Sequence, residues 1–325
     1  MRPILRYTLL LLAALPLLLL TAAGVVLAIC LSGDSPDTTR NYPAQSARLR
    51  QHVEALCAAP RYVDSKQQAR EYIVEQFRSA GFRHVHEKHF TTADGEQHCN
   101  ISVTLYGSSD KRIVIGAHYD ACDTGNGNPG ADDNASAVAV LLELARNLPT
   151  VKPRYDVELV AWDCEEPPYF DTEDMGSAHH ASSYKPEELH GVICLEMLGY
   201  FRKEPNSQPP LFPGHSLLLP TVGNFVAVVG DWNSLSLARA AYSALRRELP
   251  AVRLNIPFAH DTDLYLSDHR NYAPRDIPAI MITDTAMLRN PHYHEPTDTP
   301  DTLDYDSMAR VTRGIHEFLI EILYK

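Results

Sequence analysis

Short apolar runs alternate with longer amphipathic stretches along most of this chain. The short runs are rich in β-branched residues and bounded by turn residues, whereas the longer stretches repeat apolar residues with a helical period. The strand-like runs are residues 111–117, 157–162, 191–197, 225–229 and 279–282, and the helix-like stretches are residues 65–80, 134–148, 233–248 and 306–323. This alternation favours an α/β fold: a three-layer sandwich in which a central mixed, mostly parallel sheet has helices on both faces.

The amino-terminal end differs from the rest because residues 8–31 form a stretch of about 24 residues without charge, long enough to cross a bilayer as one helix. Arginines precede this stretch and aspartates follow it, so the positive-inside rule leaves the amino terminus in the cytoplasm. We expect residues 1–31 to be a single-pass membrane anchor, with a signal segment as the alternative, and residues 32–43 to be a linker. Residues 44–325 then form one domain on the periplasmic or extracellular side.

Acidic and histidine side chains gather where the expected strands end. His118 follows the first strand-like run, and Asp132 and Asp133 stand just before the helix-like stretch at residues 134–148. Ligands of open α/β sheets bind at the carboxyl ends of strands. Histidine beside carboxylates suits zinc, although a pair of aspartates before a helix is more often a cap.

Two further strand ends and a late loop add to this set. Glu165 and Glu166 end one strand, and adjacent side chains of an extended segment point to opposite sides, so one can bind metal while the other handles protons. Glu196 ends another apolar strand, where a glutamate rarely stays buried without a partner. The loop at residues 290–299 supplies either His292 or His294.

These residues predict a two-metal site. The candidate ligands are His118, Asp132, Glu166, Glu196 and His294, with Glu165 as the candidate general base. Five ligands exceed what one tetrahedral zinc ion uses. Two zinc ions per chain, about 3.5–4 Å apart and bridged by Asp132, would use them all.

The ordered set resembles the co-catalytic zinc aminopeptidases, a family that includes aminopeptidases S and Y and, more distantly, glutamate carboxypeptidase II and glutaminyl cyclases. The family pattern runs His-x-Asp, Gly-Ala-Asp-Asp, Glu-Glu, an acidic residue on a strand, and His before Asp-Thr, and it recurs here in order over residues 112–305. The resemblance implies a phosphorylase/hydrolase-like fold and selects His294 over His292. It also implies that Asp120 supports His118, and Glu196 stands where many relatives have aspartate.

The activity that this resemblance implies is hydrolysis of the amino-terminal peptide bond of a peptide substrate with a free N-terminus. Two rival functions stay open. A glutaminyl-peptide cyclotransferase would use one zinc ion held by Asp132, Glu166 and His294, with Glu165 moving protons. A non-catalytic ectodomain would be expected to lack ligands or the base.

Other partners are disfavoured by charge and motif context. The net charge of −12 and the lack of a basic run argue against nucleic acid. Residues 125–130 match G-x-G-x-x-G, but Asp132 and Asp133 occupy the helix start where a nucleotide phosphate would bind. The sequence has no G-x-S-x-G and no H-E-x-x-H motif.

Several residues near the expected site have no assigned role. Ser267, Asp268 and His269 resemble a family segment close to the metals, and His269 is either a substrate contact or a packed residue. Cys122, Cys164 and Cys194 neighbour proposed site residues, but the ligand set does not need a thiolate. The candidate pocket aromatics, for most of which core packing is the favoured interpretation, are Tyr200, Phe201, Phe258 and Tyr293.

Overall fold

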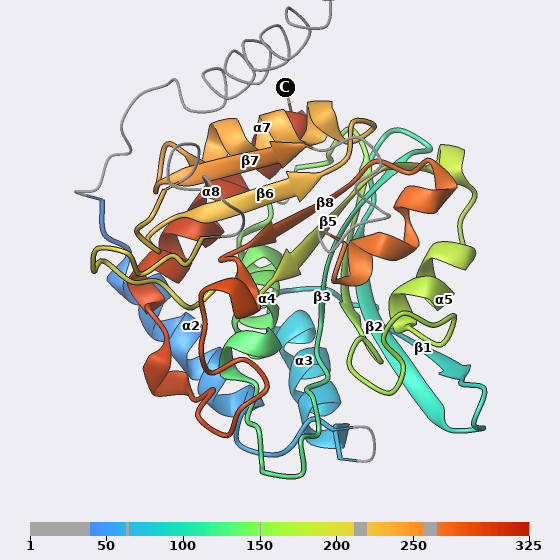
Figure 1. The fold of residues 1–325 in the computed structure, drawn as a ribbon. Helices are drawn as coiled ribbons and strands as arrows, with labels where there is room; N and C mark the ends of the chain where they lie inside the picture. Colours follow the sequence, from blue (N-terminus) through green and yellow to red (C-terminus); the bar gives the residue numbers. More distant parts are fainter. Residues whose placement is uncertain (1–39, 63–64, 150, 211–219, 256–264, 325) are drawn as a thin grey trace, which may run out of the picture.

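A single mixed sheet forms the centre of the protein in a computed structural model that describes residues 40–62, 65–149, 151–210, 220–255 and 265–324. Its eight strands lie in the order β1-β2-β4-β3-β5-β8-β6-β7 (Figure 1). The strands are β1 His86–Thr91, β2 Gln97–Leu105, β3 Arg112–His118, β4 Asp156–Trp162, β5 Leu189–Glu196, β6 Val226–Gly230, β7 Ala251–Asn255 and β8 Ala279–Thr283.

The four central strands β4, β3, β5 and β8 run parallel, as the apolar runs predict. Strand β2 joins β4 antiparallel and β6 joins β8 antiparallel, so the sheet is mixed. Both faces of the central strands are covered, because every residue of β3 after Arg112 is buried. Such double burial explains why these strands have continuous apolar sequences without polar alternation.

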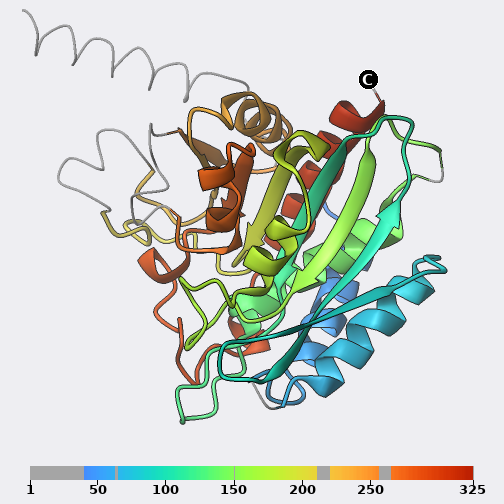
Figure 2. The same ribbon diagram turned by 90° about the vertical axis from the view of Figure 1, so that its right-hand side faces the viewer.

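Helices cover the two faces unequally (Figures 1 and 2). The helices are α2 Pro43–Leu56, α3 Gln67–Ser79, α4 Ala137–Asn147, α5 Gly176–Ser182, α7 Leu235–Leu245 and α8 Tyr305–Tyr324. All except α5 share one core with side chains such as Ile113 and Ile115 of β3, whereas Val114, pointing to the other face, packs in the core that includes Ala181 of α5. The three-layer architecture is thus present, with the thicker helical layer on one side.

The elements that the sequence pattern does not predict are mainly polar or peripheral. Strand β1 is an edge strand with the sequence HEKHFT, and Phe90 is its one buried residue, so it lacks an apolar run. Helix α4 begins at Ala137, later than expected, because Asp133 and Asn134 have non-helical backbone angles. This kink precedes the helix at the place where site residues are expected.

The expected membrane anchor at residues 1–31 and most of the linker lie outside the described residues. Within the described part of the chain, no helix combines the length and apolar character needed to span a bilayer. The first described helix, α2, begins at Pro43, where the linker is expected to end.

Candidate metal centre

The expected site residues meet at the carboxyl ends of the central parallel strands. His118 is the last residue of β3, Glu165 and Glu166 follow β4, and Glu196 is the last residue of β5. His294 reaches them from the segment between β8 and α8. Because parallel strands end at one edge of the sheet, residues far apart in sequence lie side by side there.

Three carboxylates surround one nitrogen of His118. Its Nε2 atom lies 3.3 Å from Asp133 Oδ1, 3.5 Å from Glu196 Oε2 and 3.8 Å from Glu165 Oε2. The imidazole is only 1% exposed, and the three carboxylates around it are also buried. The single N–H of a neutral imidazole can donate a good hydrogen bond to only one of the three carboxylates. A cation bound between the imidazole and the carboxylates therefore explains the arrangement better than a hydrogen bond does.

A second imidazole lies on the opposite side of Asp133. His294 Nε2 lies 3.2 Å from Asp133 Oδ2 and 3.2 Å from Glu166 Oε2. Asp133 therefore presents one oxygen to each histidine. This is the geometry expected of a carboxylate that bridges two metal positions.

The bridging position was predicted for Asp132, and the structure corrects this prediction. The Asp132 carboxylate points away from the histidines and accepts hydrogen bonds from the Gly199 amide, at 2.8 Å, and from Asn290 Nδ2, at 2.7 Å. The Asp298 carboxylate accepts hydrogen bonds from the backbone N–H groups of both Asp132 and Asp133. The non-helical backbone at Asp133 turns the side chains of Asp132 and Asp133 to different sides. The sequence pattern predicts an ordinary helix start here, so it does not show which of the two aspartates faces the histidines.

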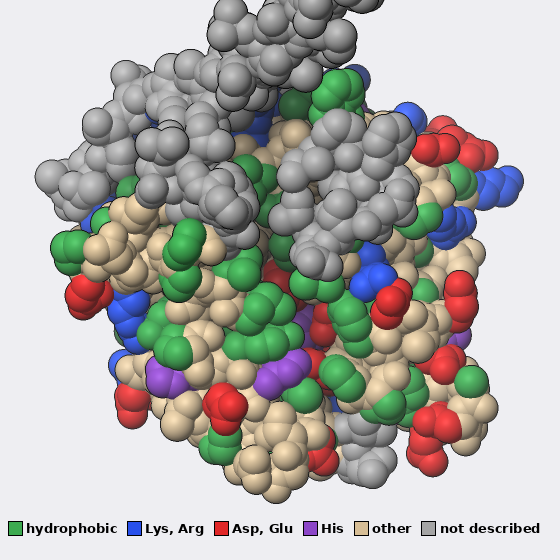
Figure 3. Space-filling model, viewed as in Figure 1, with side chains coloured by type: hydrophobic (Ala, Val, Ile, Leu, Met, Phe, Trp, Pro, Cys, Tyr) green, Lys and Arg blue, Asp and Glu red, His purple; other side chains and the backbone are tan. Residues whose placement is uncertain are grey.

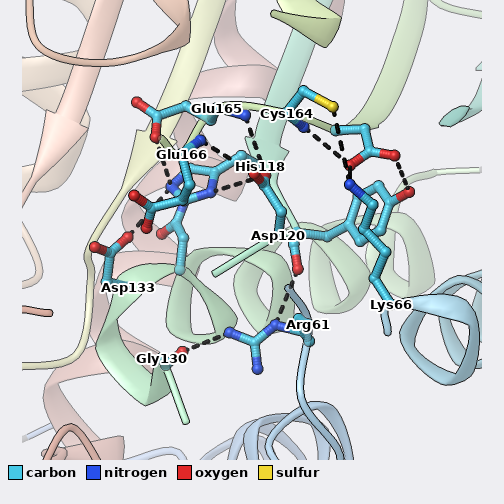
Figure 4. Close-up of polar contacts among 12 residues, drawn as sticks. Arg61, Lys66, His118, Asp120, Gly130, Asp133, Cys164, Glu165 and Glu166 are labelled. Carbon is cyan, nitrogen blue, oxygen red and sulfur yellow. Dashed lines mark hydrogen bonds and ion pairs between the residues drawn. The ribbon is translucent and has the colours of Figure 1, made fainter. Parts of the chain in front are cut away.

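The loop before the kink has a shape that needs a glycine and a buried arginine. Gly130 has φ 62°, and a Cβ there would lie 2.3 Å from the Asp133 carbonyl oxygen. The Arg61 guanidinium donates to the Gly130 carbonyl on this loop (Figure 4). It also donates to the carbonyls of Pro129, on the same loop, and of Tyr119, beside His118. One side chain therefore joins the two segments that carry His118 and Asp133.

Asp120 occupies the supporting position implied by the resemblance. Its Oδ1 atom lies 3.4 Å from His118 Nδ1, on the side of the ring away from the carboxylate cluster. The same carboxylate accepts hydrogen bonds from the backbone N–H groups of Glu165, at 3.2 Å, and Glu166, at 3.0 Å (Figure 4). Asp120 thus fixes both the imidazole orientation and the start of the Glu-Glu segment.

A second buried network lies beneath the end of β4. Asp163 forms an ion pair with Lys66 and accepts a hydrogen bond of 2.8 Å from the Tyr119 hydroxyl. The Cys99 amide donates to the same carboxylate. These partners satisfy a charge that is fully buried, and they anchor the backbone two residues before Glu165.

The segment at residues 267–269 also contacts the site. Ser267 Oγ donates a hydrogen bond of 2.6 Å to Glu196 Oε2 and so orients that carboxylate. Asp268 is fully buried, and burial raises its pKa to about 7. His269 is also fully buried, which agrees with the interpretation of a packed residue rather than an exposed substrate contact.

The crowding of charges changes the acidity of the whole cluster. Burial, together with the negative charge of Asp133, raises the pKa of Glu166 to about 8. Burial raises the pKa of Glu165 well above its usual range, and the charges of Glu196 and Glu166 add to the effect. Burial opposes the charged form of His294, but hydrogen bonds with Asp133, Cys122 and Glu166 raise its pKa to about 12. Positive charge therefore stabilises this cluster strongly.

The donor set fits divalent metal ions such as zinc. Nitrogen and oxygen donors, all buried except the half-buried His294, converge from five segments of the chain, and Glu166 Oε1 is enclosed without a hydrogen-bond partner among the described residues. Carboxylate and imidazole donors within bonding reach of a common point are typical of zinc sites in enzymes. His118, Asp133 and Glu196 would hold one ion, and Asp133, Glu166 and His294 would hold the other.

An apolar cavity opens beside the cluster. Its empty volume is about 930 Å³, including space open to solvent, and it is lined by site carboxylates on one side and by mostly apolar side chains on the other. The apolar wall includes Phe170, Ala227, Val229, Leu254, Leu266, Met281, Met287, Leu288 and Tyr293. In Figure 3, acidic and histidine side chains lie in a hollow between hydrophobic ones.

Of the four candidate pocket aromatics, Tyr293 lines this cavity and stacks on His294 with ring centroids 3.7 Å apart. Tyr200 and Phe201 are buried and are not part of its lining, as core packing predicts. Phe258 lies outside the described residues. The apolar wall itself comes mainly from β6 and β8 and from the turn at residues 286–288, and no sequence motif marks it.

Sequence comparison identifies the family. Residues 100–319 match Peptidase family M28. The Escherichia coli protein YfbL, described as uncharacterized, is 44% identical over 272 residues, which are 81% of each chain. Leucine aminopeptidase 1 of Arthroderma otae is 25% identical over 236 residues, 69% of this chain and 57% of that protein. The match thus spans less than two thirds of the fungal enzyme.

Solved structures share the fold at lower identity. A Zn-dependent exopeptidase from Parabacteroides distasonis superimposes with a TM-score of 0.63 at 18% identity, covering 86% of this chain and 98% of that one. Glutaminyl cyclase from Porphyromonas gingivalis also gives a TM-score of 0.63, at 19% identity, covering 85% and 98%. The fold alone is therefore common to hydrolases and cyclases, and the sequence match decides the family. This chain belongs to peptidase family M28, the zinc metallopeptidases.

Proposed function

We propose that this chain is a membrane-anchored aminopeptidase that removes amino-terminal residues from peptides at a site holding two zinc ions. One observation carries the proposal: Asp133 presents one oxygen to His118, at 3.3 Å, and the other to His294, at 3.2 Å. Glu196 lies beside His118, and Glu166 lies beside His294. The two ligand sets share Asp133, which is the arrangement of two-metal hydrolases.

When bound, the ions supply a water that ionises near neutral pH and a Lewis acid for the scissile carbonyl. Glu165 is the proposed general base: it takes the proton of the attacking water and passes it to the leaving amine. Its carboxylate lies 3.8 Å from His118 Nε2, within the same buried cluster.

The cavity determines which amino-terminal residues fit. Its walls of aliphatic and aromatic side chains favour a large apolar side chain next to the scissile bond. Met281 from β8 and Val229 from β6 form part of this wall. The name of the fungal relative, leucine aminopeptidase, supports the same substrate class.

Cyclisation of amino-terminal glutamine is the second candidate, because a glutaminyl cyclase has the same fold. With Asp133 in place of Asp132, a single zinc ion would be held by Asp133, Glu166 and His294. This function leaves His118 and Glu196 unexplained, although both are buried and lie 3.5 Å apart at the metal position that a single-zinc cyclase would not use. A non-catalytic ectodomain is disfavoured because the ligands and the base are all present.

The anchor is proposed from the sequence alone. Residues 8–31 have no charge, and the basic residues that precede them favour an external location for residues 44–325. Alkaline phosphatase fused after residue 325 should be active only if this end of the chain is outside the cytoplasm. Inactive fusions with stable expression would contradict the proposed orientation.

Metal content and activity on the detergent-solubilised full chain test the function. Two zinc ions per chain, with chelator-sensitive cleavage of aminoacyl amides, are the expected result. One zinc ion with conversion of amino-terminal glutamine to pyroglutamate would establish the cyclase instead. A chain that binds no metal would exclude both enzymes.

A further inference from the structure

One donor beside the second metal position belongs to no predicted ligand set. The Cys122 sulfur, a carboxylate oxygen of Glu166 and a ring nitrogen of His294 all lie within 4.8 Å of one another. Three atoms at such separations have a common point within about 2.8 Å of each, close to the ~2.0–2.3 Å bonds that zinc makes with nitrogen, oxygen and sulfur. Small side-chain movements would bring all three within bonding distance.

The environment of Cys122 differs from that of the other cysteines in the described residues. Cys99, Cys164 and Cys194 belong to apolar core clusters, and Cys57 packs against one. Cys122 is buried but lies outside these clusters, against Glu166 and His294. Cys99 and Cys164 also lie near histidine and carboxylate groups, but among the described residues only Cys122 lies within 4.8 Å of two of the proposed metal ligands.

The backbone holds Cys122 in place from both sides. Its carbonyl accepts a hydrogen bond of 3.3 Å from Asn128 Nδ2, and the preceding amide, of Ala121, donates to the Arg61 carbonyl. Asn128 also accepts a hydrogen bond from the Gly130 amide, at the start of the kink. The thiol is thus fixed relative to the segment that carries Asp133.

A second observation points to a ligand here. Glu166 is 4% exposed, and its Oε1 atom is enclosed without a hydrogen-bond partner among the described residues. A buried carboxylate oxygen without a donor is costly unless a cation satisfies it. Asp133, Glu166, His294 and Cys122 together would give four protein donors around one ion.

We propose that Cys122 is a sulfur ligand of the second metal position and biases that position towards zinc and other thiophilic ions. This inference rests on the proposed zinc site and adds a ligand to it. A soft thiolate disfavours manganese and magnesium, which prefer oxygen donors. The position shared by Asp133, Glu166 and His294 should therefore discriminate between metals more strongly than the position of His118 and Glu196.

Zinc K-edge X-ray absorption of the zinc-loaded full chain tests the proposal. Wild type should show a Zn–S distance of about 2.3 Å with half a sulfur per zinc, separate from the ~2.0–2.1 Å nitrogen and oxygen shell. The sulfur shell should vanish in Cys122→Ser and persist in Cys57→Ser, a matched control at a half-buried thiol. We also expect Cys122→Ser to hold the second zinc at least about tenfold more weakly.

Absence of a sulfur shell in wild type, or its persistence in Cys122→Ser, would overturn the proposal. If Cys122→Ser does not fold, the wild-type spectrum still decides, as does a cadmium-loaded sample examined for Cd–S bonding. Zinc content and peptide cleavage, measured on the same wild-type sample, distinguish failure of the Cys122 ligand from failure of the proposed zinc enzyme. Two zinc ions and cleavage without sulfur would reject only the Cys122 ligand, whereas failure to bind zinc would reject the metal site as well.

Discussion

At the scale of single residues, Asp132 and Asp133 show how two identical neighbours acquire different roles. Asp133 is held by ion pairs with two imidazoles, whereas Asp132 is held by the Gly199 amide and Asn290. Burial opposes ionisation of Asp133, but its hydrogen bonds with His118 and His294 hold its pKa below the usual range. For Asp132, burial and the charge of Asp284 raise the pKa well above that range. One residue therefore stays ready to bind cations, and the other is a structural acceptor.

Substitution of each aspartate by asparagine should separate these roles. We expect Asp133→Asn to lose zinc from both proposed positions, because both would share its carboxylate. Asp132→Asn keeps a carbonyl acceptor of similar shape and should retain close to two zinc ions per chain, with a lowered melting temperature. Metal analysis after gel filtration measures the difference. Loss of zinc in Asp132→Asn with full retention in Asp133→Asn would restore the original assignment.

Glu165→Gln tests the proposed base. The amide cannot accept the proton of the attacking water, so kcat should fall by roughly 10²–10⁴-fold while zinc content stays unchanged. Glu187→Gln, at an exposed position just before the amino end of β5 and thus at the edge of the sheet opposite to the site, is the matched control. Near wild-type turnover in Glu165→Gln would show that another group handles the proton.

At the scale of elements, the site depends on how loops are fastened to strand ends. Arg61 follows α2 and is 1% exposed, yet its guanidinium donates to carbonyls beside both His118 and Asp133. The same side chain also donates to the Leu56 carbonyl at the end of α2. Helix α2 is thereby joined to the metal-binding edge of the sheet, although it contributes no ligand.

Replacing Arg61 should loosen these loops. Arg61→Ala leaves several buried carbonyls without donors at about 1–3 kcal/mol each, so the free energy of unfolding should fall by at least about 3 kcal/mol. Arg50→Ala is the control, since its ion pairs with Glu54 and Asp301 are exposed and contribute about 0–1 kcal/mol. Urea unfolding of the zinc-loaded proteins compares the two. Equal effects would indicate that water replaces the lost donors.

In the proposed aminopeptidase, strands β6 and β8 would set substrate preference through the side chains that line the cavity. Ala227 of β6 lines the cavity and is 2% exposed, so a larger residue there removes space that an incoming side chain needs. Ala227→Leu should lower kcat/KM for leucyl amides by about 10–200-fold per displaced methylene while sparing alanyl amides. The ratio of the two kcat/KM values is the measurement. An unchanged ratio would place the substrate side chain elsewhere.

At the scale of the whole molecule, the sequence predicts those elements in which nearly every residue is buried. The central strands are buried on both faces, and their apolar runs identify them and the edge at which His118, Glu166 and Glu196 meet. The choice between Asp132 and Asp133 depends on the backbone angles of a kink, which no periodicity encodes. Arg61 and the cavity wall come from segments distant in sequence, so only the folded chain shows that they act at this site.

At the same scale, buried carboxyl groups make the stability of the folded domain depend on pH. In the metal-free chain, burial raises the pKa of Glu166 and of Asp298 to about 8, and that of Asp284 to about 6. A folded-state pKa above the unfolded value means that the folded chain binds more protons. The stability due to these groups is therefore present below about pH 4 and is lost as pH rises towards 8. Glu143 and Glu158, with pKa values lowered to about 2, affect stability only in more acidic solution.

Zinc should remove this dependence, because a bound cation stabilises the ionised carboxylates that the empty cluster destabilises. Between pH 5.5 and 8 we expect the chelated chain to lose up to about 1.4 kcal/mol of unfolding free energy per pH unit for each raised group, and the zinc-loaded chain to change little. Urea unfolding at both pH values, with and without chelator, measures the difference in unfolding free energy between the zinc-loaded and the chelated chain. This difference should increase with pH, since zinc also binds better once its ligands are deprotonated. Parallel pH profiles for the two forms would show that the buried carboxylates are neutralised by the protein alone and that the cluster was not built around a cation.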